Sequence, residues 1–250
     1  MPINVSVVII TRNAAKTLRR TLDAVQDYDD VVVYDNGSED DTCDIVKAYP
    51  NTQLHQGEFM GFGPTKKYAV SLAKHDWIFS LDADEAPTAA LNAAVQQWSA
   101  TATPQQAGSI RRENWMMGSP VKHSGWGNDW LIRLFNRTVC NFSDAAVHES
   151  VLTPKGIHLI QLKGKIEHLA VSNLAQFLEK INRYSSIRAE SGKLKTYPVP
   201  IIFFKAVFAF LRTYLLQHGW LDGWRGLVIA VSNANGVFWK YMKAYWLSKH

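Results

Sequence analysis

Three apolar runs, each leading directly into polar residues, constrain the fold of this chain more than any other feature. They lie at residues 5–10, 31–35 and 77–81, and each has the length of a strand. The first run has no basic start and no small-residue cleavage site after it, so it indicates a strand rather than a signal peptide. Continuous apolar strands are typical of parallel sheets that are covered on both faces.

Helical patterns separate these runs. Leu18, Leu22 and Val25 recur at helical spacing between the first two. Ser38, with Asp41 three residues later, has the pattern of a capping box and predicts a helix that runs to about residue 48. A further helix is expected after residues 87–88. The alternation of strands and helices predicts an α/β fold, with a mostly parallel sheet flanked by helices.

Polar clusters follow the three predicted strands, at residues 11–13, 35–38 and 82–84. Ligands of such sheets bind beyond the carboxyl ends of the strands, so we expect the clusters to meet at one edge. No Gly-x-Gly-x-x-Gly follows the first strand, and no phosphate-loop motif is present. Dinucleotide-binding and P-loop folds therefore lose support.

Asp82 and Asp84 flank a single small residue at the end of the third run. Two carboxylates this close repel each other unless a cation lies beside them. Mg²⁺ or Mn²⁺ would accept their oxygens together with substrate phosphates. The alternative is an acidic turn that starts the next helix. The position at a strand end favours the metal site.

Asp35 has two interpretations. It is an ordinary turn residue before Asn36 and Gly37, and the local sequence slightly favours this. Its carboxylate would alternatively accept the N3–H of a uracil ring, with Thr11 at the end of the first strand beside it.

Charge divides the 250 residues unequally. Residues 1–150 carry 13 basic and 18 acidic side chains, whereas residues 151–250 carry 14 basic and 4 acidic ones. A basic half indicates a polyanionic partner, either nucleic acid or an anionic membrane surface. The 47% hydrophobic content excludes a disordered chain, and two cysteines exclude a disulfide scaffold or a cysteine-ligated zinc module.

The basic half has the pattern of a membrane-surface segment. Residues 173–192 predict one charged helix, and residues 199–216 contain 14 apolar residues of 18. Lys205 and Arg212 lie seven apart on one helix face, which favours a helix in the membrane interface over one that crosses it. The alternative is a helix packed on the preceding domain. Side chains suited to lipid headgroups follow: Trp220, Trp224, Trp239, Tyr241, Tyr245 and Trp246.

The strand-end motifs together resemble those of the family-2 glycosyltransferases, which have the nucleotide-sugar-binding GT-A fold. The motifs are SVVIITRN (6–13), VYDNGSEDDT (33–42) and FSLDADE (79–85). Later segments are similar to the subgroup of β-glucosyltransferases that act on the inner-core heptose of lipopolysaccharide. These are residues 61–69, 123–135, 147–149 and 218–227.

The resemblance implies a metal-dependent, inverting transfer from a nucleotide sugar. Asp84 would bind the divalent cation directly, and Asp82 would contact the ribose, or the metal through water. His148 would be a third metal ligand or a phosphate contact. Glu149 is the first choice for the general base, and Asp129 and Asp144 are its rivals.

Other positions are expected to bind substrate. Many relatives carry an Arg-Asn pair where this chain has Lys66 and Lys67, which are either cations near the diphosphate or a solvated pair. Arg133 would contact the diphosphate or the acceptor, or would be an exposed strand residue. The full set of substrate-binding candidates is Thr11, Asn13, Asp35, Lys66, Lys67, Asp82 and Arg133.

The sequence thus predicts a catalytic domain over residues 1–170 and a basic helical extension over 171–250. The resemblance implies transfer of a hexose, glucose from UDP-glucose, to the inner-core heptose of a lipid-linked acceptor. The enzyme would lie on the cytoplasmic face of the inner membrane, bound to anionic lipid. The alternatives are another donor or acceptor in envelope glycan synthesis, or a basic membrane-surface protein without activity. The acidic first half argues against nucleic acid.

Overall fold

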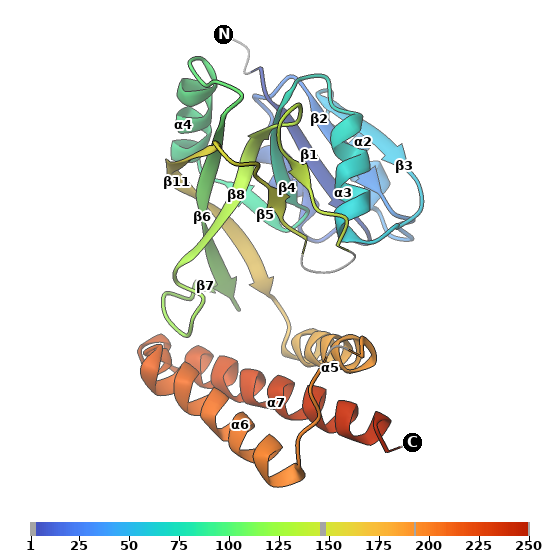
Figure 1. Ribbon diagram of the computed structural model, residues 1–250. Coiled ribbons are helices and arrows are strands. Elements are labelled where there is room, and N and C mark those ends of the chain that lie inside the picture. The colour runs from blue at the N-terminus through green and yellow to red at the C-terminus, as the bar shows by residue number, and fades with distance from the viewer. Residues whose placement is uncertain (1–3, 146–148, 193, 250) are drawn as a thin grey trace. The chain divides into compact units, whose positions relative to one another are not determined.

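The computed structural model describes residues 4–145, 149–192 and 194–249, and they form two compact units (Figure 1). The first, here called the sheet unit, comprises the chain up to Arg112 together with Asp129–Leu169. The second, the helical unit, comprises Glu113–Asn128 and the chain from Ala170 onward.

Four parallel strands form one half of the main sheet, in the order β3-β2-β1-β4. Side chains of β1 and β2 are buried on both faces, as continuous apolar runs require. The predicted strands are therefore confirmed, and β3 is added at the edge. The bounds are β1 Ser6–Thr11, β2 Val31–Asp35, β3 Thr52–Gln56 and β4 Trp77–Asp82.

Antiparallel strands continue the sheet beyond β4, in the order β8-β6-β11-β5. β8 pairs with β4 and with β6, and β11 pairs with β5. The α/β fold class is confirmed, with a mixed sheet. The bounds are β5 Glu85–Pro87, β6 Gln106–Met116, β7 Ser119–Pro120, β8 Asp129–Asn136 and β11 His158–Val171; a separate pair is β9 Asn141–Phe142 with β10 Val151–Leu152.

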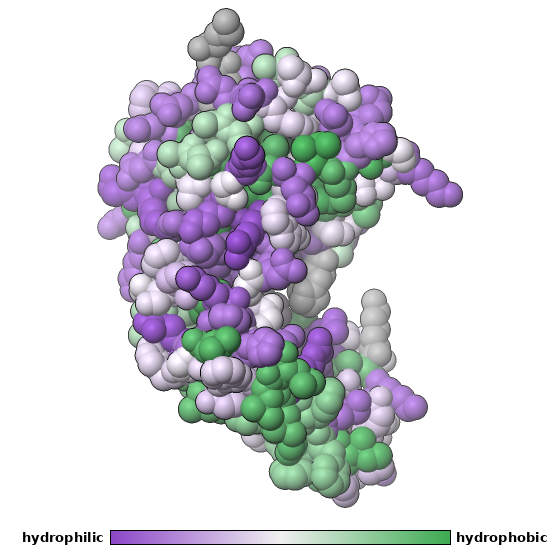
Figure 2. All heavy atoms as spheres, turned by 90° about the vertical axis from the view of Figure 1, so that its left-hand side faces the viewer, coloured by the Kyte–Doolittle hydropathy of each residue, from purple (hydrophilic) through white to green (hydrophobic). Residues whose placement is uncertain are grey.

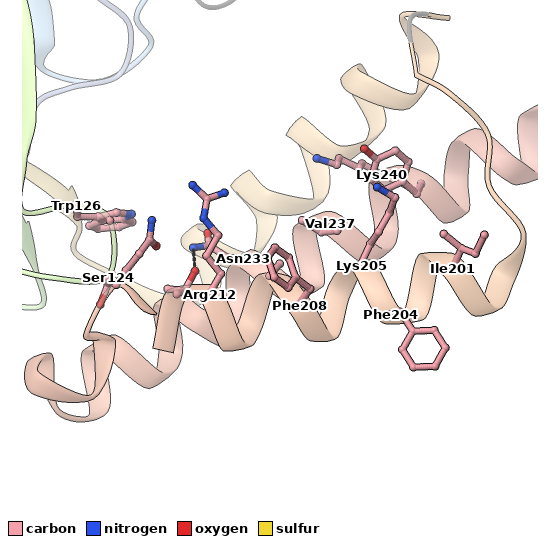
Figure 3. Close-up of a pocket in the computed structure, with 15 residues that line it drawn as sticks. Ser124, Trp126, Ile201, Phe204, Lys205, Phe208, Arg212, Asn233, Val237 and Lys240 are labelled. Atoms are coloured by element: carbon pink, nitrogen blue, oxygen red, sulfur yellow. Dashed lines mark hydrogen bonds between the residues drawn. The ribbon is translucent and has the colours of Figure 1, made fainter. Parts of the chain in front are cut away.

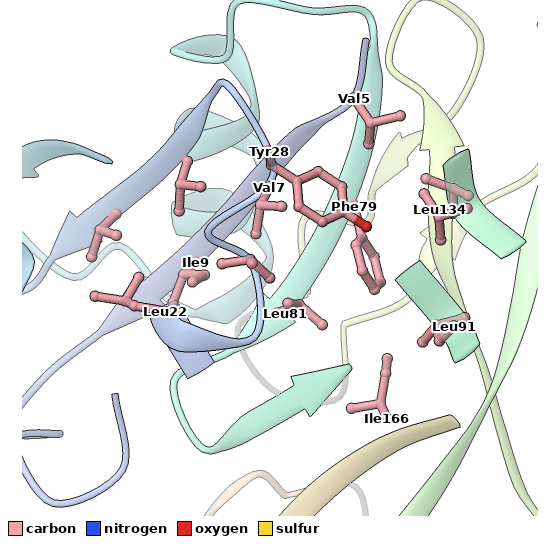
Figure 4. Packing of buried hydrophobic residues seen from close by; sticks show 14 of the residues in the cluster. Val5, Val7, Ile9, Leu22, Tyr28, Phe79, Leu81, Leu91, Leu134 and Ile166 are labelled. Carbon is pink, nitrogen blue, oxygen red and sulfur yellow. The ribbon is translucent and has the colours of Figure 1, made fainter. Parts of the chain in front are cut away.

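The sheet separates two apolar cores. Alternate residues of β1 point to opposite faces, so Val7 and Ile9 join one core whereas Val8 and Ile10 join the other. Figure 4 shows the first core, in which Val7 and Ile9 lie with Phe79 and Leu81 of β4. Helices of the sheet unit are α1 Leu18–Asp23, α2 Thr42–Lys47, α3 Phe62–Ser71 and α4 Ala89–Ser99.

Two helix starts test the capping arguments. Thr88 caps α4 by accepting a hydrogen bond from the Leu91 N–H, as a helix after residue 88 predicts. The predicted capping box at Ser38 is wrong, because α2 begins only at Thr42. The Ser38 hydroxyl instead accepts from the Asn13 N–H and donates to Asp35.

The helical unit contains α5 Leu174–Glu190, α6 Val199–Leu211 and α7 Trp224–Leu247. Asn173 caps α5 by accepting from the N–H groups of Ala175 and Gln176. A π-helical turn, Arg212–Leu216, extends α6, and a 3₁₀ turn, Gly219–Asp222, precedes α7. α7 packs against both α5 and α6.

Much of the apolar surface of the helical unit faces solvent. By length and composition alone, Val199–Leu216 could cross a bilayer, and only 11% of it is buried. Figure 2 shows hydrophobic side chains gathered on the surface of this unit. Large hydrophobic side chains of α6 and its extension that are more than half exposed are Phe203, Phe204, Phe208, Leu215 and Leu216.

Candidate active site at the carboxyl edge of the parallel strands

The ends of β1, β2 and β4 lie at one edge of the sheet. Thr11 is the register partner of Asp35 on β2, and Ile10 is the partner of Asp82 on β4. All three strands are parallel, so their carboxyl ends point the same way. The structure therefore brings together the polar clusters that the sequence places after each strand.

Lys66 joins two of the predicted carboxylates. Its Nζ lies 2.8 Å from Asp82 Oδ1 and 2.7 Å from Glu149 Oε1. The side chain is only 5% exposed and its ammonium lies 5.4 Å from the centre of the Phe142 ring. All four residues line a cavity of about 510 Å³. A buried lysine needs such counter-charges, because a charge without partners in this environment is strongly unfavourable.

Arg133 is held by carboxylates on its other side. Its Nη2 lies 2.7 Å from Asp82 Oδ2 and 2.6 Å from Oε1 of Glu85, which is fully buried. Arg112 also reaches Glu85 Oε1, at 3.2 Å. Arg133 is thus a buried member of an ion-pair network and not an exposed strand residue. Its Nε is buried without a hydrogen-bond partner among the described residues.

Asp82 is held ionised by this network. Burial alone would raise the pKa of its carboxyl, but Arg133 and Lys66 outweigh burial and hold that pKa well below its usual range. The Asp82 backbone N–H also donates to Glu85 Oε2 at 3.0 Å, which fixes the turn after β4. Asp82 therefore presents a negative charge to the cavity at all ordinary pH values.

Asp84 lies beside a histidine that the sequence did not single out. Its Oδ2 is 3.5 Å from His168 Nε2, because β11 pairs with β5 and sets His168 opposite Glu85. The Asp84 carboxylate fits Mg²⁺ or Mn²⁺, and the imidazole favours Mn²⁺ of the two. Within the described residues, no group of three or more His, Cys, Asp or Glu side chains is placed to hold a metal. Substrate oxygens and water would have to complete the coordination.

Asp35 and Thr11 have different surroundings at the same edge. Asp35 is fully buried, and its Oδ1 accepts from the N–H groups of Gly37 and Ser38 at 3.1 and 3.0 Å. This is the turn role, and the second oxygen, bound by the Ser38 hydroxyl, retains accepting capacity. The Thr11 hydroxyl is buried and has no partner among the described residues. Asn13 links the two loops by accepting from the Glu39 N–H at 2.8 Å.

The remaining candidates lie in different environments. Asp129 is held by Arg112, whose Nη2 is 2.8 Å from Oδ2. Asp144 is exposed and pairs with the exposed Lys67 at 2.9 Å. His148, a predicted metal ligand, lies outside the described residues. Among the rivals for the base, Glu149 thus differs by sharing a buried cation with Asp82.

Sequence reasoning missed Glu85, Arg112 and His168. Glu85 follows the Asp-x-Asp motif directly but has no role in that motif, and it lies in β5 rather than in a turn that starts a helix. Arg112 and His168 come from strands whose pairing with this region no local pattern reveals. Their roles depend on contacts between segments far apart in the chain.

Comparison with known proteins identifies the family of this chain. Residues 6–153 match the domain family described as Glycosyl transferase family 2. An uncharacterized glycosyltransferase of Rickettsia typhi is 25% identical over 98% of this chain and 87% of its own length. The lipopolysaccharide core biosynthesis glycosyltransferase LpsC of Rhizobium meliloti is 24% identical over 96% and 91%.

The structure of residues 1–349 of S. aureus TarS aligns with the whole chain and with 91% of its own, at a TM-score of 0.47 and 14% identity. The family match covers more than half of the chain and includes the strands that carry Thr11, Asp35 and Asp82. The chain belongs to glycosyl transferase family 2.

Proposed function

We propose that the protein transfers glucose from UDP-glucose to the inner-core heptose of lipopolysaccharide, with inversion at the anomeric carbon. Family membership supports glycosyl transfer, and the relative LpsC, named for lipopolysaccharide core biosynthesis, supports the acceptor class. The observation that carries the proposal is the cavity in which Lys66 holds both Asp82 and Glu149.

The donor nucleotide would lie along the strand ends. The unpartnered Thr11 hydroxyl and the second oxygen of Asp35 are buried polar groups that a uracil ring can satisfy. Asp82, held ionised at the end of β4, would accept from a ribose hydroxyl. These groups orient the donor before any bond changes.

Asp84 and His168 would hold a divalent cation. When bound there, the cation would supply positive charge to the diphosphate as it leaves. The fold must hold the Asp84 and His168 side chains together at the edge of the sheet. The pairing of β5 with β11 does this.

Glu149 would act as the general base. A bond forms between the acceptor oxygen and C1 of the sugar, and the bond from C1 to the diphosphate oxygen breaks, so the electron pair leaves with UDP. The proton of the acceptor hydroxyl passes to the Glu149 carboxylate. Lys66 fixes that carboxylate by its 2.7 Å contact, which limits the orientations available to the base.

The helical unit would dock on the cytoplasmic face of the inner membrane, where a lipid-linked acceptor would be found. Its exposed phenylalanine and leucine side chains on α6 suit the acyl boundary, and its exposed Trp220, Trp224 and Trp239 suit the headgroup region. Docking would bring the active site to an acceptor that cannot leave the membrane.

The test measures UDP release by purified protein with Mn²⁺ or Mg²⁺, a panel of UDP-sugars and heptose-terminated lipopolysaccharide. We expect turnover of UDP-glucose only, and only with both metal and acceptor. Asp84→Ala should lower kcat/KM by about 100-fold or more. Asp44→Ala, which removes an exposed carboxylate on α2, should leave it within about twofold.

Two other results would change the proposal. Turnover of a different UDP-sugar, or of a different envelope glycan acceptor, would retain the reaction and replace the substrate. Failure to bind any nucleotide sugar, with vesicle binding retained, would instead support a membrane-surface protein without activity.

A further inference from the structure

A second cavity, of about 680 Å³, lies within the helical unit and shares no lining residue with the cavity of the candidate active site. α6, the π-helical turn, α7 and residues 124–126 line it. Figure 3 shows Lys205 on α6 and Arg212 on the π-helical turn. Lys240 of α7 lies next to Lys205. Three cationic side chains from two helices thus line one cavity.

These cations have no acidic partners among the residues that the structure describes. Within the described part of the chain, no carboxylate lies within 4 Å of Lys205, Arg212 or Lys240. The contacts of the two lysines are aromatic: Lys205 Nζ is 4.4 Å from the Tyr197 ring centre, and Lys240 Nζ is 5.0 Å from that of Tyr241. Burial, then Arg188 and Lys205, lowers the pKa of Lys240, so positive charge is crowded here.

The surrounding unit supplies little negative charge. Residues 113–128 and 170–250 carry 12 Lys or Arg and only 4 Asp or Glu, a net charge of +8. The carboxylate of Asp222 is already hydrogen-bonded to residues 123 and 124. It accepts from the His123 N–H at 3.0 Å and the Ser124 hydroxyl at 2.8 Å. Crowded like charges destabilise a fold, so an anion from outside would relieve them.

The apolar surface beside the cavity indicates where that anion comes from. Phe204 and Phe208 line the cavity and are 68% and 59% exposed, and Phe203 on the same helix is 56% exposed. A free phosphate would leave these rings in water. A phospholipid would place its headgroup among the cations and its acyl chains against the rings.

We propose that this cavity binds the phosphate headgroup of an anionic lipid, with Lys205 and Lys240 on one side and Arg212 on the other. Lys205 and Arg212 are seven residues apart, about 10 Å along the helix axis. The inference rests on the proposed docking at a membrane and adds a defined headgroup site to it. It does not depend on the transfer reaction.

The test compares two variants with the same loss of charge. The cavity variant is Lys205→Gln/Arg212→Gln/Lys240→Gln. Its control, Lys180→Gln/Arg183→Gln/Lys249→Gln, removes three exposed cations of the helical unit outside the cavity. Sedimentation measures binding of each to phosphatidylcholine vesicles with and without 30% phosphatidylglycerol.

We expect the cavity variant to lose at least tenfold in affinity for the anionic vesicles, and the control to lose clearly less. Equal losses would overturn the headgroup site, because diffuse attraction depends on net charge alone. Unchanged binding by the cavity variant would overturn it as well. If the unaltered protein ignores anionic vesicles, membrane docking itself fails, and the headgroup site with it.

Thermal unfolding adds a readout that does not need membranes. Removing crowded cations should leave the melting temperature of the cavity variant equal to or above that of the unaltered protein, so lost binding cannot be ascribed to misfolding. Inorganic phosphate at matched ionic strength tests the free anion. Protection by phosphate that the cavity variant loses, without vesicle binding, would overturn the lipid as the source. UDP release with a water-soluble heptose acceptor, which needs no membrane docking, should be equal in all three proteins.

Discussion

At the scale of single residues, the proposed active site depends on cations that are shared between carboxylates. Lys66 contacts Asp82 and Glu149, and Arg133 contacts Asp82 and Glu85. Removing any one charge leaves its partner buried without full compensation, which costs more than the pair contributes. Conservative substitutions that keep shape but remove charge are therefore the informative ones.

Glu149→Gln tests the proposed base. The amide keeps the shape of the side chain but cannot accept the acceptor proton, so kcat should fall by about 100-fold or more, with little change in KM for the donor. Steady-state kinetics measures both. Asp144→Asn is the matched control, because that carboxylate is exposed and pairs with an exposed lysine. A larger loss for Asp144→Asn would transfer the role of base to Asp144.

Asp82 predicts a pH dependence of stability. The pKa of Asp82 is lower in the folded protein than the ordinary value of 3.8. The ionised carboxylate therefore stabilises the fold above pH 3.8, and this stabilisation is lost as the pH falls below that value. Asp82→Asn should thus be less stable than the unaltered protein at pH 7, and the difference should shrink below pH 3.8. Denaturant unfolding across this range measures it.

The matched control for this pH dependence is Asp76→Asn. The Asp76 carboxylate is 58% exposed and pairs with Arg137, so its removal should cost less than about 1 kcal/mol. A gap between the unaltered protein and Asp82→Asn that stays constant down to pH 3 would contradict the assignment.

At the scale of elements, α3 packs tightly on the loop that leads to Glu149. A Cβ on Gly63 would lie 2.0 Å from the Ser143 carbonyl oxygen and 2.7 Å from that of Ala145. Both are backbone atoms, so the loop would have to move. Gly63→Ala should therefore lower the free energy of unfolding by about 1–3 kcal/mol and lower kcat as well.

Gly236→Ala gives the opposite expectation on α7. Its Cβ would meet only Ile181 Cγ2, at an ordinary 3.5 Å. Alanine in a helix interior loses less backbone entropy than glycine, so stability should rise by about 0.5–1 kcal/mol. Denaturant unfolding of both variants compares them. Equal effects of the same sign would mean that the close approach at Gly63 carries no constraint.

Element boundaries show what local sequence can predict. The apolar runs located β1, β2 and β4, and Thr88 located the start of α4, because burial and capping are short-range properties. Ser38 does not cap α2 because its hydroxyl accepts from the Asn13 N–H and donates to Asp35. Asn13 lies on a different strand end, so its contact depends on the sheet.

At the scale of the whole molecule, charge is divided between the two units. The helical unit has a net charge of +8, so the rest of the chain has −3 within the total of +5. Raising NaCl from 0.05 to 0.5 M should weaken binding to anionic vesicles by at least about tenfold, because salt screens exposed charges. Vesicle sedimentation at each salt concentration measures this.

The proposed active site provides the internal control for that experiment. Its ion pairs are largely buried and screened less, so KM for the donor should change far less with salt. Vesicle binding that salt does not weaken would contradict an electrostatic attraction and leave the apolar surface of α6 as its source.

The sequence by itself determined the positions of β1, β2 and β4 along the chain, the carboxylates at the strand ends and the family, because each is carried by contiguous residues. Only the tertiary structure decided which charged side chains form ion pairs with each other. Glu85 meets Arg133, and Asp84 meets His168, through pairing between strands far apart in the chain. Electrostatic interaction depends on distance in space and on burial, and neither can be read from separation along a sequence.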